Sequence, residues 1–177
     1  MNIYVSGGSK CGKSDFAENL AKAMSEEMDL PLYYVATMIP KDNEDLLRVD
    51  KHRKMRKDKG FQTLELKTPE DIGTFLPYIS QGVFLIDSVT AILENTIFDE
   101  NYSIDENGWR SVTDSLIEFM DKGKNLVFVS DFIYSDGVEY DQYTEIYRKN
   151  LALCDRRLAE KCDQVWEVTF GCPLQWK

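Results

Sequence analysis

Short apolar runs alternate along this chain with longer segments in which apolar residues recur every three or four positions. The short runs are rich in β-branched and aromatic residues, which is typical of buried strands, and they comprise residues 3–5, 32–36, 83–86, 126–129 and 165–170. The spacing from Phe16 to Met24 predicts a helix directly after the first run. Strands that alternate with helices predict an α/β fold with a mostly parallel sheet and helices on both faces. Residues 32–36 are expected to pair in parallel with the first strand.

Turn and cap signals place the remaining elements. A proline preceded by Thr68 and followed by Glu70 and Asp71 predicts a helix that continues to Ile79. A polar helix is expected over 44–59, a short strand over 61–66, and further helices over 109–122 and about 146–158. Because no repeat, low-complexity tract or linker interrupts the pattern, we expect one domain over residues 1–177.

Composition narrows the class of protein. The 177 residues include 21 basic and 31 acidic side chains, which give a formal net charge of −10. Such a chain has no general attraction to nucleic acid or anionic membranes, and none of its apolar runs is long enough to span a bilayer. The four cysteines lack paired C-x-x-C spacing, so neither a disulfide framework nor a zinc site is expected. We therefore expect a soluble cytoplasmic protein with reduced thiols.

A glycine-rich turn follows the first apolar run. Gly7, Gly12, Lys13 and Ser14 fit G-x-x-x-x-G-K-[ST], the phosphate-binding loop, and the strand before it and the helix after it are the context that this motif requires. In such loops backbone N–H groups surround phosphates, the lysine reaches the terminal phosphates and the hydroxyl binds Mg²⁺. The alternative is a chance glycine turn, which the complete motif disfavours. The full loop comprises Gly7, Gly8, Ser9, Lys10, Cys11, Gly12, Lys13 and Ser14.

Asp87 ends the apolar run that begins at Val83. A carboxylate at the end of a buried parallel strand is the expected position for an Mg²⁺-binding residue beside a phosphate-binding loop. Aspartate is also common at such positions as a helix cap, and the strand pattern alone does not separate the two interpretations. The upstream loop favours the metal-binding role.

His52 is the only histidine, and it lies in the most basic segment of the chain, residues 48–57. Arg48, His52, Arg56 and Lys59 have the spacing of residues that share one helix face. A solvated, charged face is the simpler interpretation of such a helix. The functional alternative is that neighbouring positive charges favour the neutral, nucleophilic imidazole and attract a triphosphate. The pattern leaves open an attack of histidine on phosphorus.

Several spaced motifs together resemble the bifunctional adenosylcobinamide kinase/adenosylcobinamide-phosphate guanylyltransferase family of cobalamin biosynthesis, and the likeness runs nearly end to end. That family phosphorylates the aminopropanol hydroxyl of adenosylcobinamide and then transfers GMP from GTP to the phosphate through a histidine-bound intermediate. The resemblance implies a transferase that uses GTP, with ATP as an alternative phosphoryl donor, and Mg²⁺. It also implies a homo-oligomer, by analogy a trimer, with adenosylcobinamide and its phosphate as substrates. Besides the loop, the matching residues are Tyr34-Val35-Ala36-Thr37, Arg48-Val49, His52-Arg53, Arg56, Thr63-Leu64-Glu65, Leu85-Ile86-Asp87, Val89-Thr90, Asn95 and Gly171-Cys172-Pro173-Leu174.

The same resemblance implies roles for individual residues. His52 matches the guanylylated histidine, and with Lys13 and Asp87 it forms the predicted catalytic set. Ser14 and Asp87 are expected to hold Mg²⁺. Besides the loop, the residues expected to bind the nucleotide are Ala36, Thr37, Met38, Arg53, Lys54, Met55, Arg56, Glu65 and Asp87.

The chain departs from the family pattern after Ser130. Where the family usually continues Asn-Glu-Val-Gly, this chain has Asp131-Phe132-Ile133-Tyr134, and Asp155-Arg156 stand in place of a common Asn-Gln pair. Two alternative functions therefore stay open. One is a small-molecule P-loop kinase without guanylylation, and the other is a GTP-dependent regulatory or binding module.

Overall fold

Seven strands form one sheet in the computed structural model, which describes residues 1–56, 59–75, 77, 79–98 and 104–177, with the backbone alone at positions 48, 51, 52 and 55. The strand order is β3-β2-β4-β5-β1-β6-β7, and the pairing is parallel everywhere except between β6 and β7. This arrangement confirms the predicted α/β class. The strands are β1 (Asn2–Gly7), β2 (Leu32–Ala36), β3 (Gln62–Glu65), β4 (Val83–Asp87), β5 (Leu126–Asp131), β6 (Gln164–Thr169) and β7 (Cys172–Gln175).

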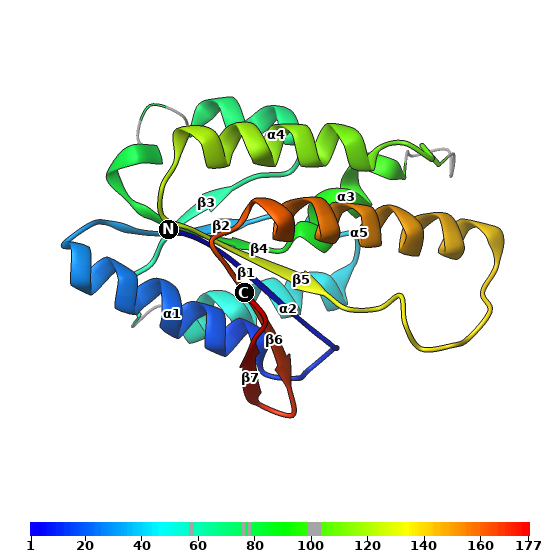
Figure 1. The fold of residues 1–177 in the computed structure, drawn as a ribbon, viewed down its shortest axis with the longest axis horizontal. Helices are drawn as coiled ribbons and strands as arrows, with labels where there is room; N and C mark the ends of the chain where they lie inside the picture. The colour runs from blue at the N-terminus through cyan, green and yellow to red at the C-terminus, as the bar shows by residue number, and fades with distance from the viewer. Residues whose placement is uncertain (57–58, 76, 78, 99–103) are drawn as a thin grey trace.

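Helices cover both faces of the sheet. Figure 1 shows α1 (Lys13–Met28) and α2 (Asn43–Arg56) below it and α3 (Val89–Ile97), α4 (Trp109–Lys122) and α5 (Gln142–Lys161) above it. Alternate residues of β1 serve the two cores, because Tyr4 packs with the α3–α5 side while Ile3 and Val5 pack with the α1 side. Burial on both faces explains the uninterrupted apolar runs of the central strands. None of the described helices has the length and apolar character that crossing a bilayer requires.

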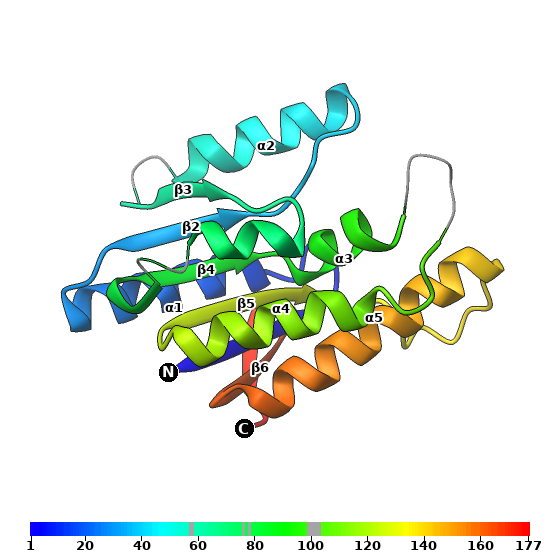
Figure 2. The same cartoon turned by 90° about the horizontal axis from the view of Figure 1, so that it is seen from above.

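The position of β2 in the sheet differs from the prediction. β2 pairs with β3 and β4, and both β4 and β5 lie between it and β1. Seen from above in Figure 2, β3 and α2 lie at one edge of the sheet, and β6, which pairs with the other edge strand β7, lies toward the opposite side. The predicted pairing of β2 with β1 was therefore wrong. The sequence of a strand does not specify which strand lies beside it. The actual order places the carboxyl ends of β4, β5 and β1 side by side.

Four local elements also depart from the sequence pattern. The segment predicted as one helix from Thr68 to Ile79 instead contains two short 3-10 helices, Pro69–Thr74 and Ile79–Gln81. Asp71 does accept hydrogen bonds from the N–H groups of Lys67 and Thr68, as the cap signal predicts, but Gly73 and Pro77 disfavour a continuous α-helix. Neither α3 nor β7 was predicted from the pattern, and α2 ends at Arg56, before the expected residue.

Candidate functional site

The phosphate-binding loop connects β1 to α1 and fits closely against its surroundings. Gly12 has a φ of 95°, in the left-handed region that favours glycine. Gly7 has no room for a side chain, because a Cβ there would overlap the Val168 carbonyl oxygen and lie 2.7 Å from Cys11 Sγ. The first N–H groups of a helix have no intrahelical partner, and α1 begins at Lys13. The loop therefore offers N–H donors and the positive end of a helix to an anion.

The turn between β6 and β7 supports this loop from the carboxyl-terminal end of the chain. Gly171 has a φ of 76°, and its N–H donates to the Cys11 carbonyl oxygen at 2.9 Å. A Cβ on Gly12 would lie 3.5 Å from Gly171 Cα. The shape of the loop therefore depends on residues far away in the sequence.

Lys13 is 8% exposed and carries a positive charge at the end of the loop. Its Nζ lies 2.6 Å from Asp131 Oδ1 and donates to the Gly8 carbonyl oxygen at 3.2 Å. Asp131 ends β5 and is paired with Gly7 in the β1–β5 register. A carboxylate thus stands directly beside the lysine expected to reach the terminal phosphates. The sequence interpretation gave Asp131 no role, although the signal that singled out Asp87, a carboxylate that ends a buried strand, is present here too.

Asp87 lies at the same edge of the sheet as the loop. It is paired with Val129 of β5, which is paired in turn with Val5 of β1, so two strand spacings, about 10 Å, separate the Asp87 and Val5 backbones. The Tyr34 hydroxyl donates to Asp87 Oδ2 at 2.8 Å. The Asp87 carboxylate and the Ser14 hydroxyl are oxygen groups of the kind that Mg²⁺ prefers.

Arg56, at the end of α2, covers the face of the Tyr34 ring. Its guanidinium carbon lies 3.4 Å from the ring centroid, and the residue is 5% exposed. The Nε and Nη1 atoms of Arg56 are buried and have no hydrogen-bond partner among the described residues. The interpretation of this helix face as solvated is therefore wrong at Arg56. Buried donors without partners are costly, so their presence fits an anionic ligand such as a nucleotide.

The loops that follow β2 and β4 are tied to each other by Thr37. Its hydroxyl donates to the Ser88 carbonyl oxygen at 2.9 Å and accepts from Ser88 N at 2.6 Å. Asn95 Nδ2 donates to the Thr37 carbonyl oxygen at 2.9 Å, which joins α3 to the same loop. Ala36 ends β2 and Met38 follows Thr37, so three of the predicted nucleotide contacts lie at this edge.

The remaining predicted residues belong to α2 and β3. Arg53 Nη2 donates to Glu65 Oε1 at 3.3 Å, which ties α2 to the end of β3. Lys54 is exposed. Position 52 lies in α2, but the side chains of His52 and Met55 are outside the described part of the chain. The structure thus brings together the loop, Asp87, Thr37 and Arg56, and gives no distance from the histidine to any of them.

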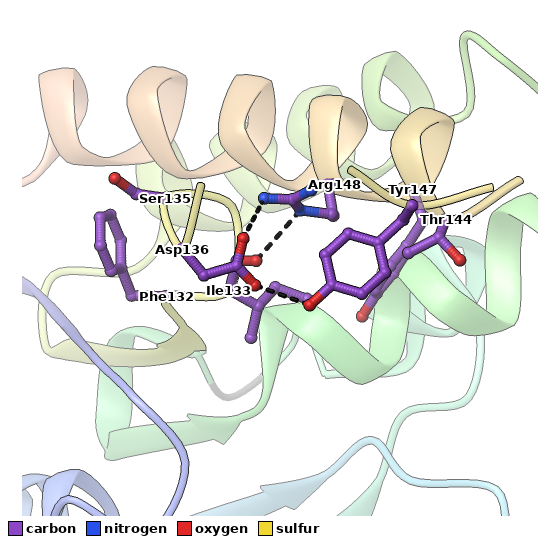
Figure 3. Close-up of a pocket in the computed structure, with 8 residues that line it drawn as sticks. Phe132, Ile133, Ser135, Asp136, Thr144, Tyr147 and Arg148 are labelled. Atoms are coloured by element: carbon purple, nitrogen blue, oxygen red, sulfur yellow. Dashed lines mark hydrogen bonds and ion pairs between the residues drawn. The ribbon is translucent and has the colours of Figure 1, made fainter. Parts of the chain in front are cut away.

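Two pockets adjoin Phe132, which lines both. The first, about 450 Å³, lies under the loop after β5, and Figure 3 shows Phe132 and Ser135 at one end and Thr144 and Tyr147 at the other. Arg148 reaches from α5 into this loop, where Nη2 contacts Asp136 Oδ1 at 2.8 Å and Nε donates to the Ile133 carbonyl oxygen at 3.2 Å (Figure 3). Arg148 therefore holds the loop against α5.

The second pocket, about 420 Å³, contains a buried carboxylate. Asp155 is 4% exposed and accepts hydrogen bonds from the hydroxyls of Tyr4, Ser130 and Tyr134. Burial raises the pKa of Asp155 to about 6, although the three hydroxyl donors oppose the shift. Because those donors occupy both oxygens, this carboxylate stabilises the wall of the pocket.

A comparison with models of protein families identifies the family of this chain. The sequence model of the family described as cobinamide kinase / cobinamide phosphate guanyltransferase matches residues 3–176. Comparison with curated proteins gives no match. Among solved structures, the crystal structure of a KaiC-like protein from the hyperthermophilic archaeon Pyrococcus horikoshii OT3 has a TM-score of 0.46 and 16% sequence identity, over 94% of this chain and 69% of that chain. Since the family match spans nearly every residue, from the strand before the phosphate-binding loop to β7, the chain belongs to the cobinamide kinase / cobinamide phosphate guanyltransferase family, whose members are transferases of cobalamin biosynthesis.

Proposed function

We propose that this protein phosphorylates adenosylcobinamide and then transfers GMP from GTP to adenosylcobinamide phosphate through a guanylyl intermediate on His52. The observation that carries the proposal is the phosphate-binding loop and Asp87 at one edge of the sheet, with Arg56 stacked on the tyrosine that bonds Asp87. The Nε and Nη1 donors of Arg56 have no hydrogen-bond partner among the residues that the structure describes. Phosphoryl transfer and guanylyl transfer have the same two requirements, a tightly held polyphosphate and positive charges where negative charge develops. The residues at this edge of the sheet can meet both requirements.

In the kinase step, the loop and Lys13 hold the triphosphate so that the acceptor hydroxyl is in line with the γ-phosphorus. A new O–P bond forms at that phosphorus while its bond to the β–γ bridging oxygen breaks, and a nucleoside diphosphate leaves. Lys13 stabilises the charge that develops on the terminal oxygens. Bound Mg²⁺, held by Ser14 and Asp87, would neutralise further phosphate charge.

In the guanylyl step, His52 attacks the α-phosphorus and pyrophosphate leaves. Position 52 precedes position 56 by one helical turn in α2, so the two positions share a helix face. Arg56 on that face is buried against Tyr34 at the nucleotide edge, and its donors suit the departing pyrophosphate. The phosphate of the acceptor then attacks the phosphorus of the histidine adduct, which releases the imidazole and gives the GDP-linked product.

Labelled GTP tests this proposal directly. With α-labelled GTP and Mg²⁺ we expect an acid-labile, alkali-stable label on the protein, and chasing with adenosylcobinamide phosphate should move the label to the small molecule. His52→Ala should abolish the label, whereas Asp50→Ala, an exposed change on the same helix, should keep it. Absence of label from the wild-type protein would overturn the covalent step.

The same assay separates the two alternatives. Transfer of a γ-label to the acceptor without any protein adduct would identify a kinase that lacks guanylylation. Hydrolysis of GTP that is indifferent to the acceptor, together with a partner whose affinity depends on the nucleotide, would identify a regulatory module.

A further inference from the structure

We propose that Asp131 is the general base of the phosphoryl transfer and that Phe132 beside it is the platform on which the acceptor lies. In the protein without nucleotide, Asp131 neutralises Lys13; when a triphosphate binds Lys13, the carboxylate is released to take the proton of the acceptor hydroxyl. This inference rests on the proposed kinase step.

The backbone around Asp131 is fixed from two sides. The N–H of Asp131 donates to Thr90 Oγ1 at 2.9 Å, and the N–H of Phe132 donates to the Gly7 carbonyl oxygen at 2.9 Å. Gly7 is the first residue of the phosphate-binding loop and the register partner of Asp131. The position of the carboxylate relative to bound phosphates is therefore set by the same ladder that holds the loop.

The distances place the Asp131 carboxylate beside a phosphate bound to Lys13. A phosphate oxygen bound to Lys13 would lie about 2.8 Å from Nζ, and Asp131 Oδ1 lies 2.6 Å from the same atom. The two oxygens are thus separated by at most about 5.4 Å, the sum of these two distances. An acceptor hydroxyl that reaches the terminal phosphate from the Asp131 side is therefore close to the carboxylate that leaves Lys13.

Binding of the triphosphate explains why Asp131 leaves Lys13. Lys13 has a nearly buried side chain, whereas about a third of the Asp131 side chain is exposed. An incoming polyphosphate carries several negative charges to the same ammonium, so it outcompetes a single carboxylate and repels it. Asp131 then keeps its charge but loses its partner, which is the state that a general base requires.

Other carboxylates near this edge already have partners that restrict them. Asp87 accepts from Tyr34, Asp136 contacts Arg148, and Asp155 is buried under three hydroxyl donors. Asp131 differs because its partner Lys13 is the side chain that the substrate takes over. Asp131 is therefore the carboxylate at this edge that becomes available to take the proton.

Phe132 marks where the acceptor binds. It is 42% exposed, it lines both pockets, and the Tyr134 ring packs against it with centroids 4.8 Å apart. An exposed aromatic ring between two hollows, directly after the proposed base, suits an acceptor whose alcohol is attached to a large group with an apolar face. In Figure 3 the Phe132 side chain stands at the end of the first pocket, away from Thr144 and Tyr147.

The proposed step is balanced in atoms and charge. The acceptor O–H gives its proton to Asp131 as its oxygen bonds to the γ-phosphorus, and the bond from that phosphorus to the β–γ bridging oxygen breaks. The nucleoside diphosphate leaves with the electron pair of that bond. Asp131 returns its proton to solvent and pairs with Lys13 again.

Asp131→Asn separates this role from a structural one. We expect the variant to bind triphosphate at least as tightly as wild type by titration calorimetry, because the competing charge is gone. Phosphoryl transfer to adenosylcobinamide should slow by about 10² to 10⁴-fold. Labelling of His52 by α-labelled GTP should stay at the wild-type level, because that step deprotonates no alcohol. Asp114→Asn, which removes an exposed carboxylate paired with Arg157, is the matched control.

Two further variants complete the experiment. Asp131→Ala should regain phosphoryl transfer when formate is added, which also reports on the fold of the variant. Phe132→Ala should raise the KM for the acceptor at least about tenfold, equivalent to about 1.4 kcal/mol, without a change in triphosphate affinity, whereas the exposed Tyr143→Ala should not.

The outcomes are distinguishable. A wild-type enzyme whose Asp131→Asn variant phosphorylates at the normal rate would overturn this inference and leave the proposed function intact. An equal loss of phosphorylation and histidine labelling would make Asp131 a structural residue and overturn the inference as well. A wild-type protein that phosphorylates nothing would overturn both.

Discussion

The Arg56 guanidinium lies 3.4 Å from the centroid of the Tyr34 ring, and the hydroxyl of the same tyrosine donates to Asp87 at 2.8 Å. This contact joins α2, which carries position 52, to the strand end proposed to hold Mg²⁺. Burial raises the pKa of Tyr34 well above its usual value, and the nearby charge of Asp87 raises it further. The tyrosine therefore keeps its proton and remains a hydrogen-bond donor. The two halves of the proposed nucleotide site are therefore in physical contact through one aromatic side chain.

Tyr34→Phe should weaken metal use while it preserves the stacked ring. The variant loses the hydrogen bond that orients Asp87, so we expect about a tenfold higher Mg²⁺ concentration for half-maximal phosphoryl transfer, equivalent to about 1.4 kcal/mol. Tyr33→Phe, which alters the neighbouring residue of β2 that stacks on Phe84, is the control. An unchanged Mg²⁺ requirement in Tyr34→Phe would contradict a role for this hydrogen bond.

Arg56→Met should change affinity and stability in opposite directions. A buried guanidinium with unpaired donors costs free energy, so the nucleotide-free variant should unfold at an equal or higher urea concentration than wild type. Its affinity for GTP should fall at least about tenfold, which calorimetry can measure. Arg110→Met removes another arginine that lies over an aromatic ring, Trp109, outside the nucleotide edge, and should leave GTP affinity unchanged. Loss of stability without loss of affinity would contradict a ligand-binding role.

Gly7→Ala should be tolerated much less well than Gly8→Ala. The new Cβ at Gly7 meets the Val168 carbonyl oxygen and Cys11 Sγ, whereas a Cβ at Gly8 meets no heavy atom within 4 Å. We expect urea unfolding to give a loss of about 1–3 kcal/mol for Gly7→Ala and a change of at most about 0.5 kcal/mol for Gly8→Ala. Equal stabilities would mean that β6 does not constrain the loop as the structure indicates.

Asp155 should make the protein less stable as the pH rises. The pKa of this carboxyl is about 6 in the folded protein and about 3.9 in an unfolded chain, so its favourable contribution is complete below pH 4 and is lost as the pH passes through 6. The loss is at most about 3 kcal/mol, since each pKa unit corresponds to about 1.4 kcal/mol. Asp155→Asn removes this titration. We therefore expect the free energy of unfolding of the variant, measured in urea and compared with that of wild type, to be higher at pH 8 than at pH 4.5. A difference in unfolding free energy that is the same at both pH values would contradict the shifted pKa.

Arg148→Lys should loosen the loop after β5. The guanidinium bonds to the carbonyl oxygens of Ile133 and Val138 and to the carboxylates of Asp136 and Glu145, a set that one ammonium cannot reproduce. We expect a loss of about 1–3 kcal/mol in unfolding free energy and faster proteolysis within residues 132–141. Triphosphate affinity should not change. Arg157→Lys, at an exposed pair with Asp114, is the control, and equal protease resistance of both variants would count against the anchoring role.

Local patterns in the sequence were sufficient to predict most elements and the start of the site. The apolar run 32–36 became β2 with the same bounds, and the spacing after the glycine turn became α1. The prediction of a single helix over residues 68–79 was wrong, because a favourable cap does not outweigh Gly73 and Pro77 within the same segment. The helix from Val89 to Ile97 was missed because its nine residues give too few turns for a clear helical period.

By itself, the sequence determined the phosphate-binding loop and the strand that ends at Asp87, because each depends on residues that are close together in the chain. It also determined the family resemblance, which rests on short motifs spaced along the whole chain. Tertiary structure alone decided that β5 lies between β4 and β1, and this order places Asp131 against Lys13. It also decided that Arg56 is buried on Tyr34 and that Val168 and Gly171 support the loop. The physical reason is that hydrophobic periodicity encodes which face of an element is buried, whereas the choice of neighbouring strand is set by packing between segments that are distant in sequence.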